Sequence, residues 1–251
     1  MEKLTAIIPT FNEAHNIVAA IKSLNFADEI MVVDSFSTDN TLELAKSIST
    51  TILQREYQNS ASQKNWAIPQ AKHEWILLLD ADERITPELK EEVIAILKSN
   101  PDISGFWIPR INYFMGKRIR FSGWQGDKVI RLFKRDACRY EQKHVHAEII
   151  TKGEVSKLKN AISHNTYVSL EAMQNKLDRY AQWQAKDYDG RTGQITPYHT
   201  VIKPFVRFIK HYIFQLGILD GKVGYIISSL QANAVKMRYH YLKKIRKERN
   251  S

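Results

Sequence analysis

Short apolar runs alternate with amphipathic stretches through the first 100 residues. The apolar runs have the length and composition of strands buried on both faces, and they lie at residues 5–10, 29–34, 51–53 and 75–79. The stretches between them have the spacing or end signals of helices, and they lie at residues 16–24, 41–47, 60–67 and 86–97. This alternation predicts an α/β fold, with a Rossmann-like, mostly parallel central sheet flanked by helices and right-handed crossovers.

Residues 101–165 have a different pattern. Strands are predicted at residues 105–110 and 128–133, and the loop between them contains several glycines. Residues 144–150 alternate in the way that an exposed edge strand does. We expect these residues to belong to the same domain as the first half, which gives one α/β domain over residues 1–165.

Residues 166–251 are expected to form a helical extension. A helix is predicted over residues 170–189, a second over 201–216, and a third that runs into the basic end of the chain. In the second helix, apolar residues such as Phe205 and Ile209 share one broad face, and Lys203, Arg207 and Lys210 recur on the other. Such a helix can lie on an anionic membrane. The alternative is that it packs on the core or on another subunit, as in a homo-oligomer formed through these helices.

Composition narrows the classes of protein. The chain has 251 residues, with 43% hydrophobic and 25% charged, which is typical of a globular protein. Cys138 is the sole cysteine, so no internal disulfide is expected, and the N-terminus shows no cleavable apolar segment, so no export is expected. No stretch reaches the ~18 apolar residues of a membrane span.

The net charge of +10 predicts an anionic partner. Because the basic residues follow apolar helix faces, we expect lipid and no nucleic acid.

Two carboxylates end the apolar run at residues 75–79. Asp80 and Asp82 would lie at the carboxyl end of a buried strand, where ligands bind in parallel sheets. Carboxylates so close together favour a hard divalent cation, which also binds phosphate oxygens. The alternative is that Asp80 caps the next element and Asp82 is solvated. Asp34 ends another strand and could accept hydrogen bonds from a base or ribose, although an ordinary turn or capping aspartate is the alternative.

The Gly-rich signatures of other nucleotide-binding folds do not follow the first strand. Neither a dinucleotide fingerprint nor a phosphate-binding loop with Gly-Lys-Ser/Thr is found there. Dehydrogenases and P-loop enzymes are therefore disfavoured.

Three segments carry a resemblance to a known family. The segments AIIPTFNE at residues 6–13, VVDSFSTDNT at 32–41 and DAD at 80–82 resemble the family-2 glycosyltransferases of the GT-A fold. The segments QKN at 63–65, RLF at 131–133 and HVHAE at 144–148 resemble the branch that includes lipopolysaccharide-core β-glucosyltransferases. The family resemblance is strong over about the first 165 residues. It implies a nucleotide-sugar half at residues 1–100 and an acceptor half at 101–165.

The resemblance implies an inverting hexosyltransferase that uses Mg²⁺ or Mn²⁺ and a UDP-sugar donor. Its donor contacts would be Pro9 and Glu13 around base and ribose, Asp34 on the base, Lys64 beside the sugar nucleotide, Asp80 on the ribose and Asp82 on the metal. A carboxylate would deprotonate the acceptor hydroxyl while the metal neutralises the departing diphosphate.

The base is expected in the second half of the domain. In the related branch a histidine directly precedes the glutamate, whereas here Ala147 separates His146 from Glu148. On a strand these two side chains would share one face, so either could meet the acceptor. We favour Glu148 as general base, with Asp127 as its main rival. His164 could supply a further metal contact; a purely structural role is the alternative for each histidine.

The resulting hypothesis is transfer of a hexose, glucose from UDP-glucose in the first instance, to a lipid-linked or lipopolysaccharide-type saccharide. The chain would be cytoplasmic and peripheral on the inner face of the cytoplasmic membrane. Two alternatives remain: a noncatalytic sugar-nucleotide sensor or membrane scaffold on the same fold, and a nucleic-acid-binding protein suggested by charge alone.

Overall fold

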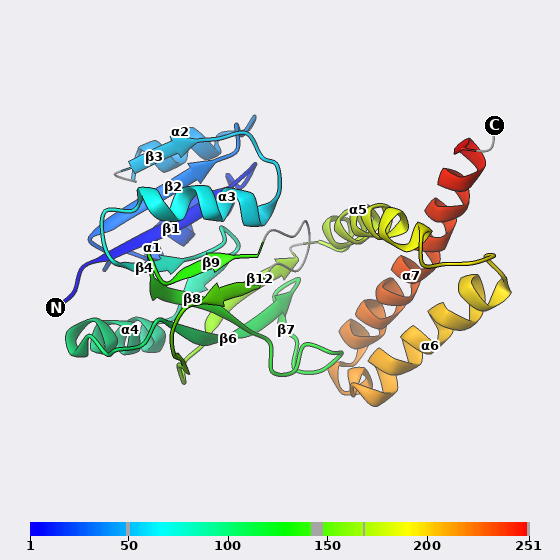
Figure 1. Ribbon diagram of the computed structural model, residues 1–251. Helices are drawn as coiled ribbons and strands as arrows, with labels where there is room; N and C mark the ends of the chain where they lie inside the picture. Colours follow the sequence, from blue (N-terminus) through cyan, green and yellow to red (C-terminus); the bar gives the residue numbers. More distant parts are fainter. Residues whose placement is uncertain (49–50, 142–147, 168, 250–251) are drawn as a thin grey trace. The chain divides into compact units, whose positions relative to one another are not determined.

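The computed structural model describes residues 1–48, 51–141, 148–167 and 169–249 (Figure 1). The chain divides into two compact units. Unit 1 comprises Met1–Ile111 and Gly126–His164, and unit 2 comprises Asn112–Gln125 and Asn165–Ser251.

Unit 1 is organised by a mixed sheet. Its strand order is β3-β2-β1-β4-β8-β6-β12-β5, with β11 also paired to β6; β7 pairs with the last residues of β6, and both of these segments belong to unit 2. The strands in this order span Thr51–Gln54, Glu29–Asp34, Leu4–Thr10, Trp75–Leu78, Lys128–Lys134, Gly105–Phe114, Ile162–Tyr167 and Glu83–Ile85; β7 spans Lys117–Arg118 and β11 Val155–Lys157. The first four strands are parallel, whereas β8 is antiparallel to both β4 and β6. A separate ribbon pairs β9 (Cys138–Tyr140) with β10 (Ile149–Thr151).

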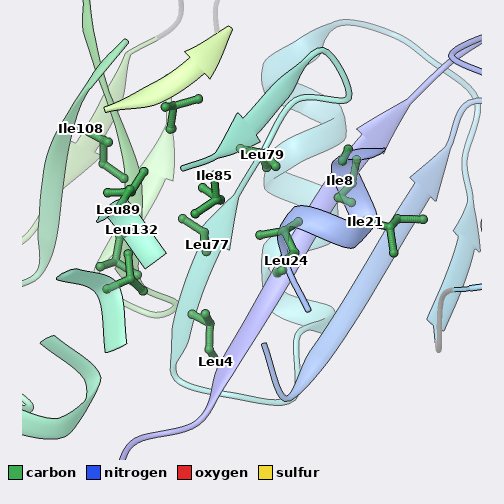
Figure 2. Close-up of a cluster of buried hydrophobic side chains, with 14 of the residues drawn as sticks. Leu4, Ile8, Ile21, Leu24, Leu77, Leu79, Ile85, Leu89, Ile108 and Leu132 are labelled. Carbon is green, nitrogen blue, oxygen red and sulfur yellow. The ribbon is translucent and has the colours of Figure 1, made fainter. Parts of the chain in front are cut away.

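The parallel strands form because their apolar runs are buried on both faces. Ile7 of β1 and Leu78 of β4 are fully buried neighbours in the sheet. One apolar cluster gathers side chains from β1, β4, α1 (Ile17–Ser23) and α4 (Pro87–Ser99), and Figure 2 shows part of it. A second cluster contains Ala67 and residues of β1, β2 and β4. The sheet is therefore a rigid base for the loops at its edge.

The remaining helices of unit 1 are short. They are α2 (Thr41–Lys46), α3 (Ser60–Ala67) and the 3₁₀ turn η1 (Ile68–Gln70). α4 begins with a cap, since the Thr86 hydroxyl accepts a hydrogen bond from the Leu89 amide and Pro87 occupies the first turn. It ends at Asn100, which has the left-handed conformation typical of helix ends.

Unit 2 is mainly helical. Its elements are α5 (Leu170–Asp189), η2 (Tyr198–Ile202), α6 (Lys203–Ile209), η3 (Lys210–Phe214), η4 (Gly217–Asp220) and α7 (Lys222–Arg249). Within this unit α5 and α6 both pack against α7 (Figure 1). Among the described residues, no helix combines the length and apolar character needed to cross a bilayer.

The predicted α/β fold is confirmed, with details that the sequence pattern did not indicate. The helix predicted over residues 201–216 is α6 flanked by two π-helical turns, η2 and η3. β5 was not predicted because it is three residues long and begins with a charge; it forms because β12 pairs with it. Of the strand predicted over residues 144–150, the described part is β10, and residues 142–147 lie outside the described residues.

Candidate functional site

The carboxyl ends of β1, β2 and β4 meet at one edge of the sheet. Thr10 at the end of β1 is the register partner of Asp34 at the end of β2. On the other side of β1, the Leu79 amide donates to the Ile7 carbonyl at 2.9 Å, which extends β4 toward Asp80. Three predicted site residues, Asp34, Asp80 and Asp82, therefore follow neighbouring strands at this edge.

Asp80 is held between two cations. The Lys64 ammonium of α3 lies 2.9 Å from Asp80 Oδ1, and Arg131 Nη2 of β8 donates to Asp80 Oδ2. Burial would raise the pKa of this carboxyl, but the charges of Arg131 and Lys64 hold its pKa well below the usual range. Asp80 is therefore a carboxylate with a fixed orientation.

Glu83 contacts Arg131, Arg110 and the main chain of Asp80. Its side chain is fully buried, and it accepts hydrogen bonds from Arg131 Nη2 at 3.1 Å, from Arg110 Nη1 at 3.3 Å and from the Asp80 amide at 3.0 Å. Burial alone would lower the pKa of the Arg131 guanidinium. The neighbouring carboxylates of Asp80 and Glu83 instead raise it well above the ordinary value. A buried carboxylate so placed fixes two arginines and one turn of the backbone together.

Arg110 then reaches Asp127. Its Nε and Nη2 atoms lie 3.0 and 2.8 Å from the two Asp127 oxygens, in a bidentate pair. The charges alternate in sign along a continuous series, which we call the charge relay: Lys64, Asp80, Arg131, Glu83, Arg110 and Asp127. Asp127 is thus connected through ion pairs to Asp80 and Lys64, and both of its oxygens already have a cationic partner.

Asp82 and His164 come together as the sequence suggested. His164 Nε2 lies 3.3 Å from Asp82 Oδ2, and His164 is 8% exposed. The charge of Asp82 also acts on Glu13, whose pKa is raised first by burial and then by this neighbour, while a 2.8 Å hydrogen bond from Asn16 opposes the rise. A carboxylate oxygen and an imidazole nitrogen side by side could hold Mn²⁺, whereas Mg²⁺ would rely mainly on the carboxylate and on substrate phosphates.

The described residues do not form a complete metal site by themselves. Among them, no group of three or more His, Cys, Asp and Glu side chains could hold an ion. The pair Asp82 and His164 offers one carboxylate oxygen and one imidazole nitrogen.

Asp34 is more enclosed than the sequence suggested. Its side chain is fully buried, and it accepts hydrogen bonds from the Ser37 amide and hydroxyl and from Gln54 Nε2 at 3.0 Å. A ligand that binds Asp34 has to replace one of these partners. In its present state Asp34 holds the turn after β2.

The loops after β1 and β2 are joined by reciprocal hydrogen bonds. The Asn12 amide donates to Ser37 Oγ at 2.9 Å, and the Thr38 amide donates to Asn12 Oδ1 at 2.8 Å. The Glu13 amide donates to Thr41 Oγ1 at 2.7 Å. Pro9 lies in β1 beside Val33 and is half-buried, so it helps to fix where this loop begins.

Three consecutive residues of α3 reach three different strands. Gln63 donates to Ser35 Oγ after β2, Lys64 pairs with Asp80 after β4, and Asn65 exchanges two 2.8 Å hydrogen bonds with the main chain of Tyr140 in β9. The Lys64 ammonium also lies 5.3 Å from the centre of the Tyr140 ring. The QKN segment therefore fixes the position of α3 over the sheet edge.

Of the predicted bases, Glu148 is exposed and precedes β10. Its main chain pairs with Glu141, whose amide donates to the Glu148 carbonyl at 2.9 Å. Within the described part of the chain, no hydrogen bond or ion pair joins the Glu148 side chain to the charge relay. His146, the remaining predicted catalytic residue, lies outside the described residues, as does His144.

Sequence reasoning gave no role to Glu83, Arg110 or Arg131. A signal was present for Arg131, because a charged residue between the apolar residues Ile130 and Leu132 of a buried strand requires a partner. No comparable signal marks Glu83, which follows two other acidic residues and could equally be solvated.

Comparisons with known proteins identify the family of this chain. The family model described as Glycosyl transferase family 2 matches residues 5–149. An uncharacterized glycosyltransferase of Rickettsia typhi is 26% identical over 98% of this chain and 88% of its own length. The lipopolysaccharide core biosynthesis glycosyltransferase LpsC of Rhizobium meliloti is 26% identical over 94% of this chain and 93% of its own.

A solved structure shares the fold. The mannosyltransferase PcManGT of Pyrobaculum calidifontis, determined with GDP-Man and Mn²⁺, superposes with a TM-score of 0.56. It is 15% identical and covers 96% of this chain and 87% of its own. Together with the family match, this likeness confirms the expected GT-A fold.

Proposed function

The chain belongs to glycosyl transferase family 2, and we propose that it is a metal-dependent, inverting hexosyltransferase that uses a UDP-sugar, in the first instance UDP-glucose. The observation that carries this proposal is the pairing of Asp82 with His164 beside the fixed carboxylate of Asp80. These groups follow the strands whose carboxyl ends bind ligands in α/β sheets.

The donor site is proposed at the edge formed by β1, β2 and β4. Asp80 would accept hydrogen bonds from the ribose hydroxyls, because its oxygens are oriented by Lys64 and Arg131. Asp34 would contact the base after exchange of a present partner, and the loop from Pro9 to Glu13 would enclose base and ribose. Lys64 would place its positive charge beside the diphosphate.

Asp82 and His164 would hold a divalent cation, Mg²⁺ or Mn²⁺. When bound, such a cation supplies charge neutralisation at the diphosphate leaving group. The chain itself would present one carboxylate oxygen from the turn after β4 and one imidazole nitrogen from β12. In support, the mannosyltransferase that shares the fold was determined with Mn²⁺ and a nucleotide sugar.

Transfer would be a single in-line displacement. The base removes the proton of an acceptor hydroxyl, whose oxygen forms a bond to the anomeric carbon. The bond between this carbon and the diphosphate oxygen breaks, its electron pair leaves with the diphosphate, and the configuration inverts.

We retain Glu148 as the base, with Asp127 as the rival and His146 as a neighbour on the same segment. Asp127 is the weaker candidate, because both of its oxygens are engaged by Arg110.

The proposed acceptor is a lipid-linked saccharide of the lipopolysaccharide-core type. The similarity to LpsC over most of both chains supports it. The chain would then work in the cytoplasm on the inner face of the cytoplasmic membrane.

Calorimetry tests the donor site. UDP, UDP-glucose and GDP are titrated with and without Mn²⁺ into the wild type, into Asp82→Asn, and into Asp102→Asn as an exposed control. We expect Mn²⁺-dependent binding of the uridine ligands that is lost in Asp82→Asn and kept in the control. If no nucleotide binds under any condition, the noncatalytic scaffold replaces the enzyme.

A further inference from the structure

Unit 2 has a group of large apolar side chains that its own described residues leave exposed. We define the apolar face by Val201, Phe205, Val206, Ile213, Phe214 and Leu219, whose side chains are all largely exposed. Phe214 is 79% exposed, and Phe205 and Leu219 are each 62% exposed. Soluble monomers rarely leave so many large apolar side chains together in water.

The helical spacing brings most of these residues onto one stripe. Val201 and Phe205 are four residues apart, as a single helix face requires, and the same turn presents Val206. The wider π-helical turn η3 then carries Ile213 and Phe214 beyond α6. The stripe thus continues over η2, α6 and η3.

The opposite side of α6 is occupied by α7. Lys203 Nζ donates to Tyr239 Oη of α7 at 2.9 Å, and Pro204 is buried. Phe208 stacks on Tyr212, and both rings contact Tyr225 of α7 edge to face. The orientation of α6 is therefore fixed, with its most apolar residues turned outward and Lys203 turned toward α7.

The charge around the apolar face has one sign. Asp220 is the sole acidic residue between Asp189 and Glu248. Its carboxylate is turned into the unit, where it accepts hydrogen bonds from the amides of Arg120 and Phe121 and from Ser122 Oγ, at 3.0, 3.0 and 2.9 Å. Arg207 of α6 and Lys210 of η3 belong to the same elements as the face, and Lys222 begins α7 shortly after η4.

We propose that the apolar face docks on an anionic lipid bilayer, with its phenylalanines in the headgroup and acyl boundary and its basic residues at the lipid phosphates. Insertion would cover the apolar side chains, and anionic lipid would neutralise the cations. A second copy of the chain fits less well. In a two-fold contact through this face, Arg207, Lys210 and Lys222 would meet their own copies, and the elements η2, α6, η3 and η4 have no exposed carboxylate to pair with them.

The proposed docking rests on the proposed function in one respect: a lipid-linked acceptor is the reason why the chain would bind a membrane. The docking itself needs neither donor nor transfer. Vesicle binding and nucleotide binding can therefore fail independently.

Sedimentation with vesicles tests the proposal. The full chain is mixed with vesicles of equimolar phosphatidylcholine and phosphatidylglycerol, or of phosphatidylcholine alone. The test variant is Phe205→Asn/Phe214→Asn/Leu219→Asn, and the control is Tyr57→Asn/Ile150→Asn, which changes residues that are 53% and 59% exposed outside the face. Calorimetry with UDP and circular dichroism verify that both variants fold.

The expected result is binding to anionic vesicles that the test variant weakens by at least about 100-fold and the control leaves unchanged. Binding should fall with added salt and on neutral vesicles. The proposal is overturned if the wild type does not bind vesicles or if the test variant binds as the wild type does. It is also overturned if the wild type is a dimer in solution that the test variant dissociates, without any lipid binding.

A fluorescent label reports insertion directly. Cys138 is 1% exposed, and burial raises the pKa of its thiol to about 11, so it should resist labelling at neutral pH. Phe214→Cys and Ile150→Cys can therefore each be labelled at one site with an environment-sensitive dye. Anionic vesicles should shift the emission of the dye at position 214 to the blue and leave that at position 150 unchanged. Equal responses at both positions would contradict the assignment.

Discussion

His164 Nε2 lies 3.3 Å from Asp82 Oδ2, although the two residues are far apart in the sequence. The antiparallel pairing of β12 with β5 brings them together, because His164 is the register partner of Glu83, the residue next to Asp82. The pairing of the three-residue strand β5 with β12 thus positions one half of the proposed metal site.

Replacing His164 should weaken metal binding more than nucleotide binding. His164→Ala removes the nitrogen ligand but leaves Asp80 and Asp82, so we expect the affinity for Mn²⁺ in the presence of UDP to fall at least about tenfold. Calorimetry with Mn²⁺ measures this change, and His73→Ala serves as the control. Unchanged Mn²⁺ affinity in His164→Ala would show that the imidazole only orients Asp82.

Glu83→Gln should destabilise unit 1 and disturb the donor site together. The substitution removes the buried charge that compensates Arg131 and Arg110, and breaking a buried ion pair costs about 3–5 kcal/mol. Urea unfolding should show this loss, whereas Glu91→Gln on the exposed side of α4 should be within about 0.5 kcal/mol of the wild type. If Glu83→Gln is as stable as the wild type, the charge relay does not depend on Glu83.

The two candidate bases can be separated by kinetics. Glu148→Gln should lower kcat by about 100-fold or more if Glu148 takes the acceptor proton, while binding of UDP-glucose stays unchanged. Asp127→Asn leaves Arg110 with a neutral partner, so it should lower stability as well as activity. A large loss of kcat in Asp127→Asn at unchanged stability, with an active Glu148→Gln, would make Asp127 the base.

Cys138 should give the chain a specific alkaline sensitivity. Burial raises the pKa of its thiol from 9.0 to about 11, so in that interval the unfolded thiol loses its proton while the folded one keeps it. The free energy of unfolding should therefore be unaffected below about pH 9 and should fall between about pH 9 and 11, at up to about 1.4 kcal/mol per pH unit. Urea unfolding of wild type and Cys138→Ala over this range measures the difference in slope. Parallel pH profiles would show that the thiol does not titrate in this way.

The sequence identified most of the sheet edge and part of the site. Asp80, Asp82 and Asp34 could be assigned because an apolar run that ends in a carboxylate indicates the end of a buried strand. Their pairing partners could not be assigned in the same way. Glu83, the first residue of β5, contacts Arg131 of β8 and Arg110 of β6, and local periodicity does not encode the antiparallel pairing that places these two strands side by side.

The helical extension shows the same limit. Its helices followed from spacing, but two π-helical turns arose without a sequence signal. Lys203 was predicted on a basic, solvated face, whereas its ammonium contacts Tyr239. Which side of an amphipathic helix meets its neighbour depends on that neighbour, here α7.

The hydrogen bonds between Asn12, Ser37 and Thr38 have a consequence for how this chain can change over time. Each loop supplies a side chain that the main chain of the other requires, so neither loop can be altered alone without leaving a backbone group unpaired. The two loops should therefore change together. Among relatives, substitutions at position 12 should accompany substitutions at position 37. If one of these loops is transplanted into a relative, it should keep its conformation when the other is transplanted with it.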